Sequence, residues 1–302
     1  MAFAAVVVEK GWMGRHQHRH EGSVAAGPTT LEAVSPDTGW NHTTSPVTQQ
    51  APEETLVAAG SAELIALDGL HLRLGPWRGS DHIAYLAPLG EPHRGAIEAA
   101  LVRLRERGFT RVITSAIAEP ELDAFVGLGF EEHDRLHLLA HDLSTVDAPT
   151  WRATRRARPA DRDRVLAIDR AAFQPFWQLD AEGLADAISA TPVTRYRVTT
   201  DERHPTGYAV FGLASERGYL QRLAVDPAYG SQGLGSALIR DGLRWLMRRG
   251  AYRALVNTQT SNERALQVYQ RHGFVLQPYQ LVVLTASLVA TPPLATPTLS
   301  SP

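Results

Sequence analysis

Cysteine is absent from this 302-residue chain, and lysine occurs only once, as Lys10. The lack of cysteine excludes disulfides, thiolate zinc sites and a cysteine nucleophile. A catalytic lysine is nearly excluded as well, because Lys10 stands in a stretch without sustained hydrophobic periodicity. The formal net charge is only −2, so the composition predicts no whole-protein field for nucleic acid or for an anionic membrane.

Long apolar runs are also missing. The apolar stretch 1–8 is followed at once by Glu9 and Lys10, and the run 281–290 is too short to span a bilayer. We therefore expect no membrane segment and a cytoplasmic protein. The length predicts about two domains, and 44% hydrophobic with 21% charged residues is typical of a globular chain.

Composition along the chain predicts four segments. Residues 1–60 are rich in small and polar residues and are expected to form an unpacked, disordered extension. Its three histidines, His16, His18 and His20, have no predictable supporting partners, so no metal site is expected there. A linker at 144–150 separates segments 61–145 and 151–286, and the Pro/Thr/Ser-rich end, 287–302, is expected to be a disordered tail.

The segment 151–286 has the clearer pattern of strands and helices. Helical spacing is seen at 159–173, 184–190, 236–249 and 263–271, and strand-like runs at 195–200, 208–213, 219–225, 253–257, 274–277 and 280–284. Hairpins before and after a strand–helix–strand unit predict an α/β fold with a mixed, mainly antiparallel sheet and helices on both faces.

A repeat connects the two segments. Residues 101–114 are similar to 243–256 at an offset of 142, and 125–130 are similar to 269–274 at an offset of 144. Two amphipathic helices can be similar by chance, but the shared order and the shared Gly-Phe ending favour a duplication.

A glycine-rich loop lies between the run 219–225 and the helix expected from Ser236. Gly230, Gly233 and Gly235 permit positive φ and a close approach of ligand to backbone. The first N–H groups of a helix have no internal partner and carry partial positive charge, so this loop predicts a pyrophosphate site. An ordinary tight turn would also explain the glycines, and their spacing is neither G-x-G-x-x-G nor a nucleotide-triphosphate loop.

A second motif follows at 262–274. Asn262 can cap a helix, and Ala265 and Tyr269, four residues apart, share one face of it. A small residue leaves room for a ligand, and a phenol one turn later can point at it. A core tyrosine would be the simpler interpretation if the glycine loop were absent.

With both motifs in this order and separation, residues 151–286 resemble the GNAT superfamily of acetyl-CoA-dependent N-acetyltransferases. The resemblance implies transfer of an acetyl group to a primary amine by direct attack, acetyl-CoA as the acyl donor, no metal, and Tyr269 as the general acid that protonates the leaving thiolate. The residues implied in binding acetyl-CoA are Leu223, Ala224, Val225, Gly230, Ser231, Gln232, Gly233, Leu234, Gly235, Ser236, Asn262 and Ala265.

The chain departs from the family pattern in two places. Many members carry Arg or Gln where this chain has Gly230. Because pyrophosphate binding relies on backbone amides, this loss is expected to be tolerated, at the cost of weaker affinity. Members with a strand glutamate as base carry it where this chain has Tyr219. The nearest acids are Glu216 and Asp226, so Tyr219 and Gln221, which alternate onto one strand face, are expected to order a water instead.

The missing carboxylate affects which amine is expected. At pH 7 a lysine-like amine is neutral in only ~0.04% of molecules, whereas an α-amine is neutral in roughly 14%. An enzyme without a carboxylate base therefore favours a protein N-terminus or another low-pKa amine, including a small molecule. Phe173, Phe176 and Trp177, between the first two helices, are expected either to contact this acceptor or to close the core.

The segment 61–145 lacks the groups that the chemistry needs. Phe125 stands at the position of Tyr269, Ala118 at that of Asn262, and the offset of 142 places Glu91 and His93 opposite Gly233 and Gly235. We expect a degenerate, catalytically silent GNAT-like repeat, in a tandem arrangement similar to that of the mycothiol synthase family. His133, His137 and His141 would share a face only in a helix, and a strand is expected there, so no metal site is predicted.

Two other functions are compatible with parts of the sequence. A non-catalytic acyl-CoA-binding or scaffold protein could be built from two degenerate repeats, although an intact Asn262 and Tyr269 argue against it. Nucleic-acid binding through the arginines near 152–158 and on the helix 236–249 is disfavoured, because no aromatic residues are interleaved with them. The sequence predicts no oligomeric state.

Overall fold

The computed structural model of the protein describes residues 2–3, 62–148, 154–201 and 204–289. Their strands form one twelve-stranded sheet. From edge to edge its strands are β2 (Glu63–Leu67), β3 (Leu70–Pro76), β4 (Ile83–Pro88), β5 (Arg111–Ala118), β12 (Val275–Ser287), β6 (Phe130–His141), β11 (Arg253–Gln259), β10 (Arg217–Val225), β9 (Pro205–Ala214), β8 (Val193–Thr200) and β7 (Thr154–Arg156). β1 (Ala2–Phe3) pairs with β10 outside this path.

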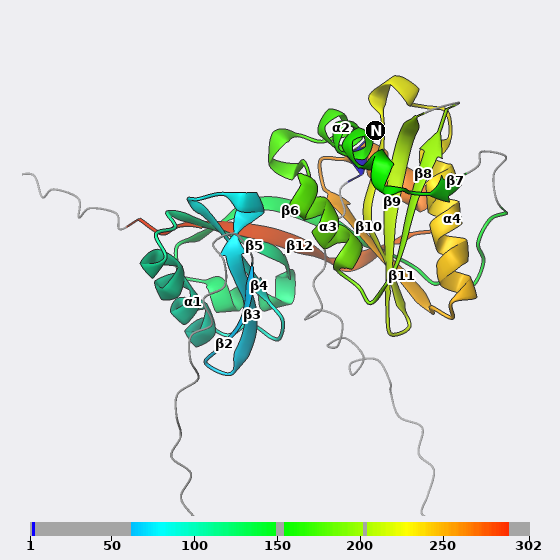
Figure 1. Ribbon diagram of the computed structural model, residues 1–302. Coiled ribbons are helices and arrows are strands. Elements are labelled where there is room, and N and C mark those ends of the chain that lie inside the picture. The colour runs from blue at the N-terminus through cyan, green and yellow to red at the C-terminus, as the bar shows by residue number, and fades with distance from the viewer. Residues whose placement is uncertain (1, 4–61, 149–153, 202–203, 290–302) are drawn as a thin grey trace, which may run out of the picture.

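Helices cover both faces of the sheet. α2 (Arg162–Ala172) and α3 (Ala181–Ser189) pack on one face, and α4 (Leu234–Arg248) and α5 (Glu263–Arg271) pack on the other. We call β2–β5 with α1 (Arg94–Glu106) the first lobe, and β7–β11 with α2–α5 the second lobe. α1 packs on the strands of the first lobe, and the long strands β6 and β12 run between the two lobes (Figure 1). Among the described pairs only β4–β5 and β10–β11 are parallel, which confirms the predicted mixed, mainly antiparallel fold.

Helix α4 shows why the sequence folds in this way. Its apolar stripe, including Leu238 and Leu243, lies buried against the sheet. Gly242 allows the close approach, because a Cβ there would stand 2.1 Å from the ring of Phe211 on β9. Gly250, with φ of +78°, follows the helix as predicted, because a left-handed residue ends a helix at little cost when it is glycine.

Several predicted boundaries are corrected. α4 begins at Leu234, two residues before the predicted start, and the two closing strands form one strand, β12, with a register break between Leu276 and Gln280. The expected unpacked extension contains Ala2–Phe3, which pair with β10, whereas His16, His18, His20 and the predicted C-terminal tail lie outside the described residues. No helix in the described part of the chain is long and apolar enough to cross a membrane.

Both lobes contain a parallel strand–helix–strand unit, β4–α1–β5 and β10–α4–β11. Ile83 pairs with Arg111 in the first unit, and Arg217 pairs with Arg253 in the second; the two arginines at the start of β5 and β11 are 142 residues apart, the offset of the sequence repeat. After this unit the lobes differ, because a 3₁₀ segment, Glu119–Phe125, stands where the second lobe has α5. The duplication itself stays a prediction.

The lobes also exchange strands. β6 follows the first lobe in sequence but lies between β11 and β12, and the last strand, β12, lies between β5 and β6. The predicted linker at 144–150 therefore does not divide the sheet into two separate sheets. The segment limits 61–145 and 151–286 stay predictions of sequence organisation.

Candidate active site

The parallel pair β10–β11 separates after three residues. Pairing runs from Arg217 to Tyr219 on β10, whereas the pairing of β10 with β9 on its other side continues to Val225. Beyond Tyr219, the edge of β10 that faces β11 therefore has no register pairing with β11 among the described residues. Ala2–Phe3 pair with Leu223 and Ala224 at this edge, so an extended segment can be hydrogen-bonded there. Leu223, Ala224 and Val225, which the family resemblance implies in binding acetyl-CoA, lie on this stretch with buried side chains.

The loop after β10 differs from the prediction in detail. Of its three glycines only Gly233 has a positive φ, +76°; Gly230 has φ of −58°, and Gly235 lies inside the first turn of α4. Ser231, a non-glycine residue, takes φ of +63°, which is uncommon for a residue with a side chain. The loop therefore relies on one glycine at the helix cap, and the exposed Ser231 and Gln232 precede it.

The start of α4 has two sources of positive charge, the N–H groups of the first helical turn and the guanidinium of Arg264. The cap residue, Gly233, has no side chain to accept the first N–H groups, so these groups remain available to an anion. The guanidinium of Arg264, in the first turn of α5, donates to the Ser231 hydroxyl at 3.2 Å. Sequence reasoning missed Arg264, although its position two residues after the capping Asn262 was a usable signal. The loop thus combines helix amides with a nearby cation, which suits a pyrophosphate.

The corresponding helix of the first lobe is closed at the same point. His93 is the cap residue of α1, and its Nδ1 accepts a hydrogen bond from the N–H of Ala96 at 3.4 Å. Its other ring nitrogen lies 3.0 Å from the Asp68 carbonyl oxygen, which fixes the ring in place. The cap residues His93 and Gly233 are 140 residues apart, so the offset of 142 misplaced His93 opposite Gly235. The imidazole thus accepts one of the first N–H groups of α1, whereas α4 has no side-chain cap.

Helix α5 starts as the sequence predicts. The side-chain oxygen of Asn262 accepts a hydrogen bond from the N–H of Ala265 at 3.1 Å. Ala265 and Tyr269 share one face, and both are fully buried in the cluster under α4 and α5. The Tyr269 ring meets Phe274 edge-on at 5.7 Å between centroids. Ala265 therefore makes room for core packing in this structure rather than for an open surface.

Burial sets the protonation state of Tyr269. Desolvation raises the pKa of its phenol well above the ordinary value, and the positive charge of Arg222 acts in the opposite direction. The phenol is therefore neutral and carries a proton at physiological pH.

The predicted acceptor residues divide into two groups. Phe173 and Trp177 are buried in the core on the α2–α3 face, whereas Phe176 is half-buried. Tyr219 and Gln221 are both buried, and Gln221 donates to the Thr191 hydroxyl at 3.4 Å. Burial raises the pKa of Tyr219 to about 12, so this phenol is neutral and is not a base in the free protein.

A buried ion pair joins β10 to α2, and sequence reasoning missed it. Arg222 on β10 binds both carboxylate oxygens of Asp169 on α2 at 2.8 Å, and the Tyr208 hydroxyl donates to the same carboxylate. A third bond runs from Arg222 to the Trp177 carbonyl oxygen at 2.7 Å. The signal was available, because Asp169 and Arg222 are charged residues within otherwise apolar patterns. These bonds connect the loop 173–179 between α2 and α3, which contains predicted acceptor residues and is called the acceptor loop below, to the strand that carries the predicted cofactor contacts.

The two acids considered as bases lie elsewhere. Asp226 caps the turn after β10 through the N–H of Ala228 at 2.9 Å and forms an ion pair with Arg164. Glu216 lies in the tight turn before β10, where its carbonyl oxygen accepts from Tyr252. The three histidines 133, 137 and 141 lie on the strand β6, as expected, and not on a helical face.

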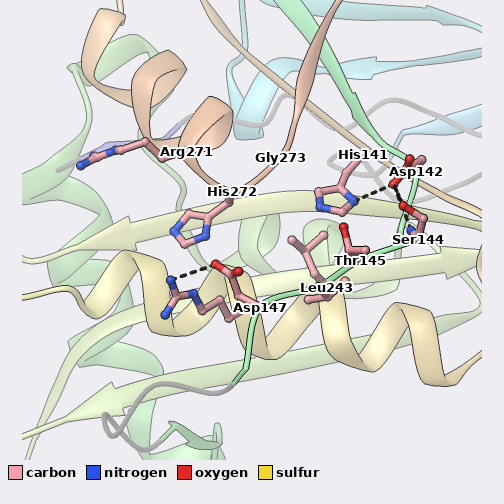
Figure 2. Close-up of a pocket in the computed structure, with 11 residues that line it drawn as sticks. His141, Asp142, Ser144, Thr145, Asp147, Leu243, Arg271, His272 and Gly273 are labelled. Atoms are coloured by element: carbon pink, nitrogen blue, oxygen red, sulfur yellow. Dashed lines mark hydrogen bonds and ion pairs between the residues drawn. The ribbon is translucent and has the colours of Figure 1, made fainter.

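A cavity of about 360 Å³ lies at the other end of α5 (Figure 2). Its lining includes His141, Asp142, residues 144–147 and the α5–β12 turn. Asp147 forms an ion pair with Arg240 at 2.9 Å, while the Arg271 side chain points away. His272 connects this cavity with the loop, because its Nε2 lies 2.9 Å from the hydroxyl of Ser236 in the first turn of α4. Burial is the main reason why the pKa of His272 is lowered to about 4.

Comparisons with known proteins agree with this geometry. The model of the acetyltransferase (GNAT) family matches residues 162–274. A mycothiol acetyltransferase from Acidimicrobium ferrooxidans is 27% identical over 51% of this chain, and the match spans 55% of that protein, so the chain matches about half of its length. A Bacillus subtilis protein, described as an alanine N-acetyltransferase of ribosomal protein bS18, is 26% identical over 43% of this chain and 83% of its own length.

Solved structures share the fold at low sequence identity. The match with a tandem GNAT protein from the clavulanic acid biosynthesis pathway covers 78% of this chain and 85% of that protein's chain, with a TM-score of 0.57 and 14% identity. A GCN5-related N-acetyltransferase from Sphaerobacter thermophilus covers 73% of this chain and 77% of its own, with a TM-score of 0.54 and 16% identity. Residues 162–274 of this chain therefore match the acetyltransferase (GNAT) family model, and the whole described chain shares its fold with solved GNAT structures.

Proposed function

We propose that the protein transfers the acetyl group of acetyl-CoA to a primary amine, with the chemistry in the second lobe. The observation that carries the proposal is the separation of β10 from β11 directly beside the open N-terminus of α4. A strand edge and uncapped helix amides fit a ligand that has an extended amide arm and a pyrophosphate. Bound acetyl-CoA supplies the thioester carbonyl that the amine attacks.

The residues of this chain have distinct parts in the proposal. The edge of β10 at Leu223–Val225 binds the extended arm, in competition with Ala2–Phe3, which pair with the same edge. The amides from Gly233 to Ser236 and the cation of Arg264 bind the phosphates, and Asn262 holds the start of α5 beside them. The acceptor approaches from the α2–α3 face, where Phe176, Tyr219 and Gln221 lie.

Tyr269 acts as the general acid. Tyr269 would donate its phenolic proton to the sulfur that leaves when the amine displaces it from the acetyl carbonyl carbon. The proton lost by the amine would pass to water, and the phenolate would be reprotonated from water. A thiol and an ordinary phenol differ by ~1.5 pKa units, or about 2 kcal/mol, and burial raises the pKa of Tyr269 further. We therefore expect the proton to move while the C–S bond breaks, and not as a separate transfer to the free thiolate.

The acceptor class is an amine of low pKa. No carboxylate base lies at Tyr219, which favours an α-amine, and the two curated relatives are named for a small molecule and for a protein alanine. Both kinds of acceptor, a small molecule and a protein N-terminus, belong in the first screen.

The test is release of coenzyme A with a panel of amines: an alanine-initiated hexapeptide, glucosamine and spermidine. The wild-type chain is compared with Tyr269→Phe, and Tyr252→Phe is the control, because Tyr252 is an exposed tyrosine outside the proposed site whose hydroxyl accepts a hydrogen bond from Arg217 at 2.6 Å. We expect Tyr269→Phe to reduce kcat by about 10²-fold or more, with the affinity for acetyl-CoA unchanged.

If the wild-type chain binds acetyl-CoA but acetylates no amine of the panel and none in a cell extract, the protein is a non-catalytic acyl-CoA-binding module. If Tyr269→Phe keeps full activity, transfer occurs and the assignment of the general acid is wrong.

A further inference from the structure

Three successive carbonyl oxygens in the loop between α2 and α3 each accept a bond from a guanidinium. Arg222, within the acetyltransferase domain, binds the Trp177 carbonyl oxygen at 2.7 Å. Arg78, from the first lobe, binds the carbonyl oxygens on either side, that of Phe176 at 2.5 Å and that of Gln178. The loop is thus held from two directions by arginines that are 144 residues apart in sequence.

Aromatic contacts from the first lobe support the same loop. Trp77 stacks on Phe176 with 5.5 Å between ring centroids and 21° between planes, and the guanidinium of Arg78 lies 4.5 Å from the Trp77 ring. His133 on β6 approaches Phe176 at 4.2 Å. Trp77, Arg78 and His133 all lie outside residues 162–274, which match the acetyltransferase family model.

Arg78 occupies an unfavourable position. Its backbone has φ of +50° and ψ of +49°, in the left-handed region that disfavours residues with a side chain. Burial and repulsion from Arg222 lower the pKa of its guanidinium to about 10. A strained residue with a desolvated cation persists where the surrounding contacts require it, and such residues are concentrated at functional sites.

The position of the loop connects it with the reaction. Arg222 follows the bulge in β10, directly before Leu223, and the same guanidinium packs 3.4 Å from the Phe173 ring. Phe176 is the half-exposed aromatic residue of the loop, at the contact between the lobes. Losing the hydrogen bonds to the carbonyl oxygens of residues 176–178 would therefore shift the acceptor loop and leave the loop 230–236 in place.

We propose that Arg78 is a positioning residue of the acceptor site: the first lobe, although it lacks the catalytic groups, fixes the α2–α3 loop through Arg78 and so determines which amine is bound. This inference rests on the proposed function, because it assigns the acceptor to that loop. A lobe that served only for stability would instead affect acetyl-CoA and acceptor alike.

The experiment uses the full chain as wild type, Arg78→Ala and Arg78→Lys. Arg94→Ala is the matched control, because Arg94 is another first-lobe arginine that donates to a backbone carbonyl, that of Val126 at 2.7 Å, away from the loop. Hydrogen exchange is measured over residues 173–179, where the N–H groups of Trp177, Gln178 and Leu179 have hydrogen-bond acceptors. KM values for acetyl-CoA and for the amine identified in the panel are measured in parallel.

We expect Arg78→Ala to accelerate exchange over 173–179 about tenfold and to raise KM for the amine about tenfold, with KM for acetyl-CoA within about twofold. Arg78→Lys, which keeps the charge but loses the two-carbonyl geometry, gives an intermediate effect and is the variant to use if Arg78→Ala does not fold. Arg94→Ala leaves all three values unchanged.

Unchanged exchange over 173–179 would overturn the positioning role, and so would a parallel rise of both KM values. If the wild-type chain acetylates no amine, the proposed function fails, and an accelerated exchange in Arg78→Ala alone would then show a structural clamp and refute a role in acceptor choice.

Discussion

The guanidinium of Arg222 and the carboxylate of Asp169 form a two-point ion pair, with both N–O distances at 2.8 Å, and both side chains are almost completely buried. The pair joins α2 to β10, so one interaction fixes a helix above the acceptor loop to the strand at the predicted cofactor edge. Removing one partner would leave the other charge buried and uncompensated.

The first prediction concerns this pair. Asp169→Asn should lower the free energy of unfolding by about 3–5 kcal/mol, because Arg222 then stays desolvated without its counter-ion. Urea unfolding at pH 7 measures the loss. The control is Glu98→Gln, which removes an exposed ion pair with Arg94 and should cost less than about 1 kcal/mol. Equal effects of both substitutions would contradict the buried-pair interpretation.

A second prediction tests the loop at the start of α4. Gly233 and Gly250 flank this helix with φ of +76° and +78°, and an added Cβ meets no atom within 4 Å at either position. Alanine at each should therefore cost a similar amount of stability, about 1–2 kcal/mol, through the left-handed backbone. Only Gly233→Ala places a methyl group and a distorted backbone where phosphates would approach, so only this variant should weaken acetyl-CoA binding, by about tenfold.

Calorimetric titration with acetyl-CoA gives the affinities, and thermal unfolding confirms that the two variants are equally destabilised. A similar loss of affinity in Gly250→Ala would mean that the effect comes from α4 as a whole and not from its N-terminus.

The third prediction is a pH dependence of stability. His272 has a folded-state pKa of about 4, below the ordinary 6.5, so the unfolded chain binds more protons between these two values. The contribution of His272 is therefore fully present above pH 6.5 and is lost as the pH falls toward 4, to an extent of at most about 3 kcal/mol. The pKa of the buried His141 is lowered in the same direction.

Unfolding free energies measured between pH 4 and pH 7 test this. His272→Asn should flatten the slope in that window, whereas His82→Asn, a change at an exposed histidine, should leave it as in the wild type. An unchanged slope in His272→Asn would show that other groups cause the dependence.

The fourth prediction concerns the exchanged strands. A chain limited to residues 151–289 lacks β6, so β11 and β12 each lose the neighbour that lies between them. Unpaired strand edges associate with other chains, and we expect this shortened chain to aggregate or to form oligomers. Size-exclusion chromatography and circular dichroism measure this against a chain of residues 62–289. A stable monomer from 151–289 would show that the second lobe folds without β6.

Much of the second lobe could be predicted from sequence because its signals are local. The cap at Asn262, the glycine after α4 and the apolar stripe of that helix depend on residues within a few positions of one another. In the segment 61–145, the sequence repeat located the helix α1, but its offset of 142 misplaced the cap residue His93 by two residues. Which glycine of the loop takes a positive φ was not predictable, because Ser231 shares the strained turn.

The sequence by itself predicted the family resemblance of residues 151–286, most of the strands and helices of that segment, and the loop and helix at which the predicted cofactor residues stand. Only the tertiary structure decided that β6 and β12 change places between the lobes, that His93 closes one helix while Gly233 leaves the other open, and that Arg78 reaches the acceptor loop. The physical reason is range. Backbone conformation and capping depend on neighbours in sequence, whereas strand pairing and buried polar contacts depend on which distant residues the sheet brings together.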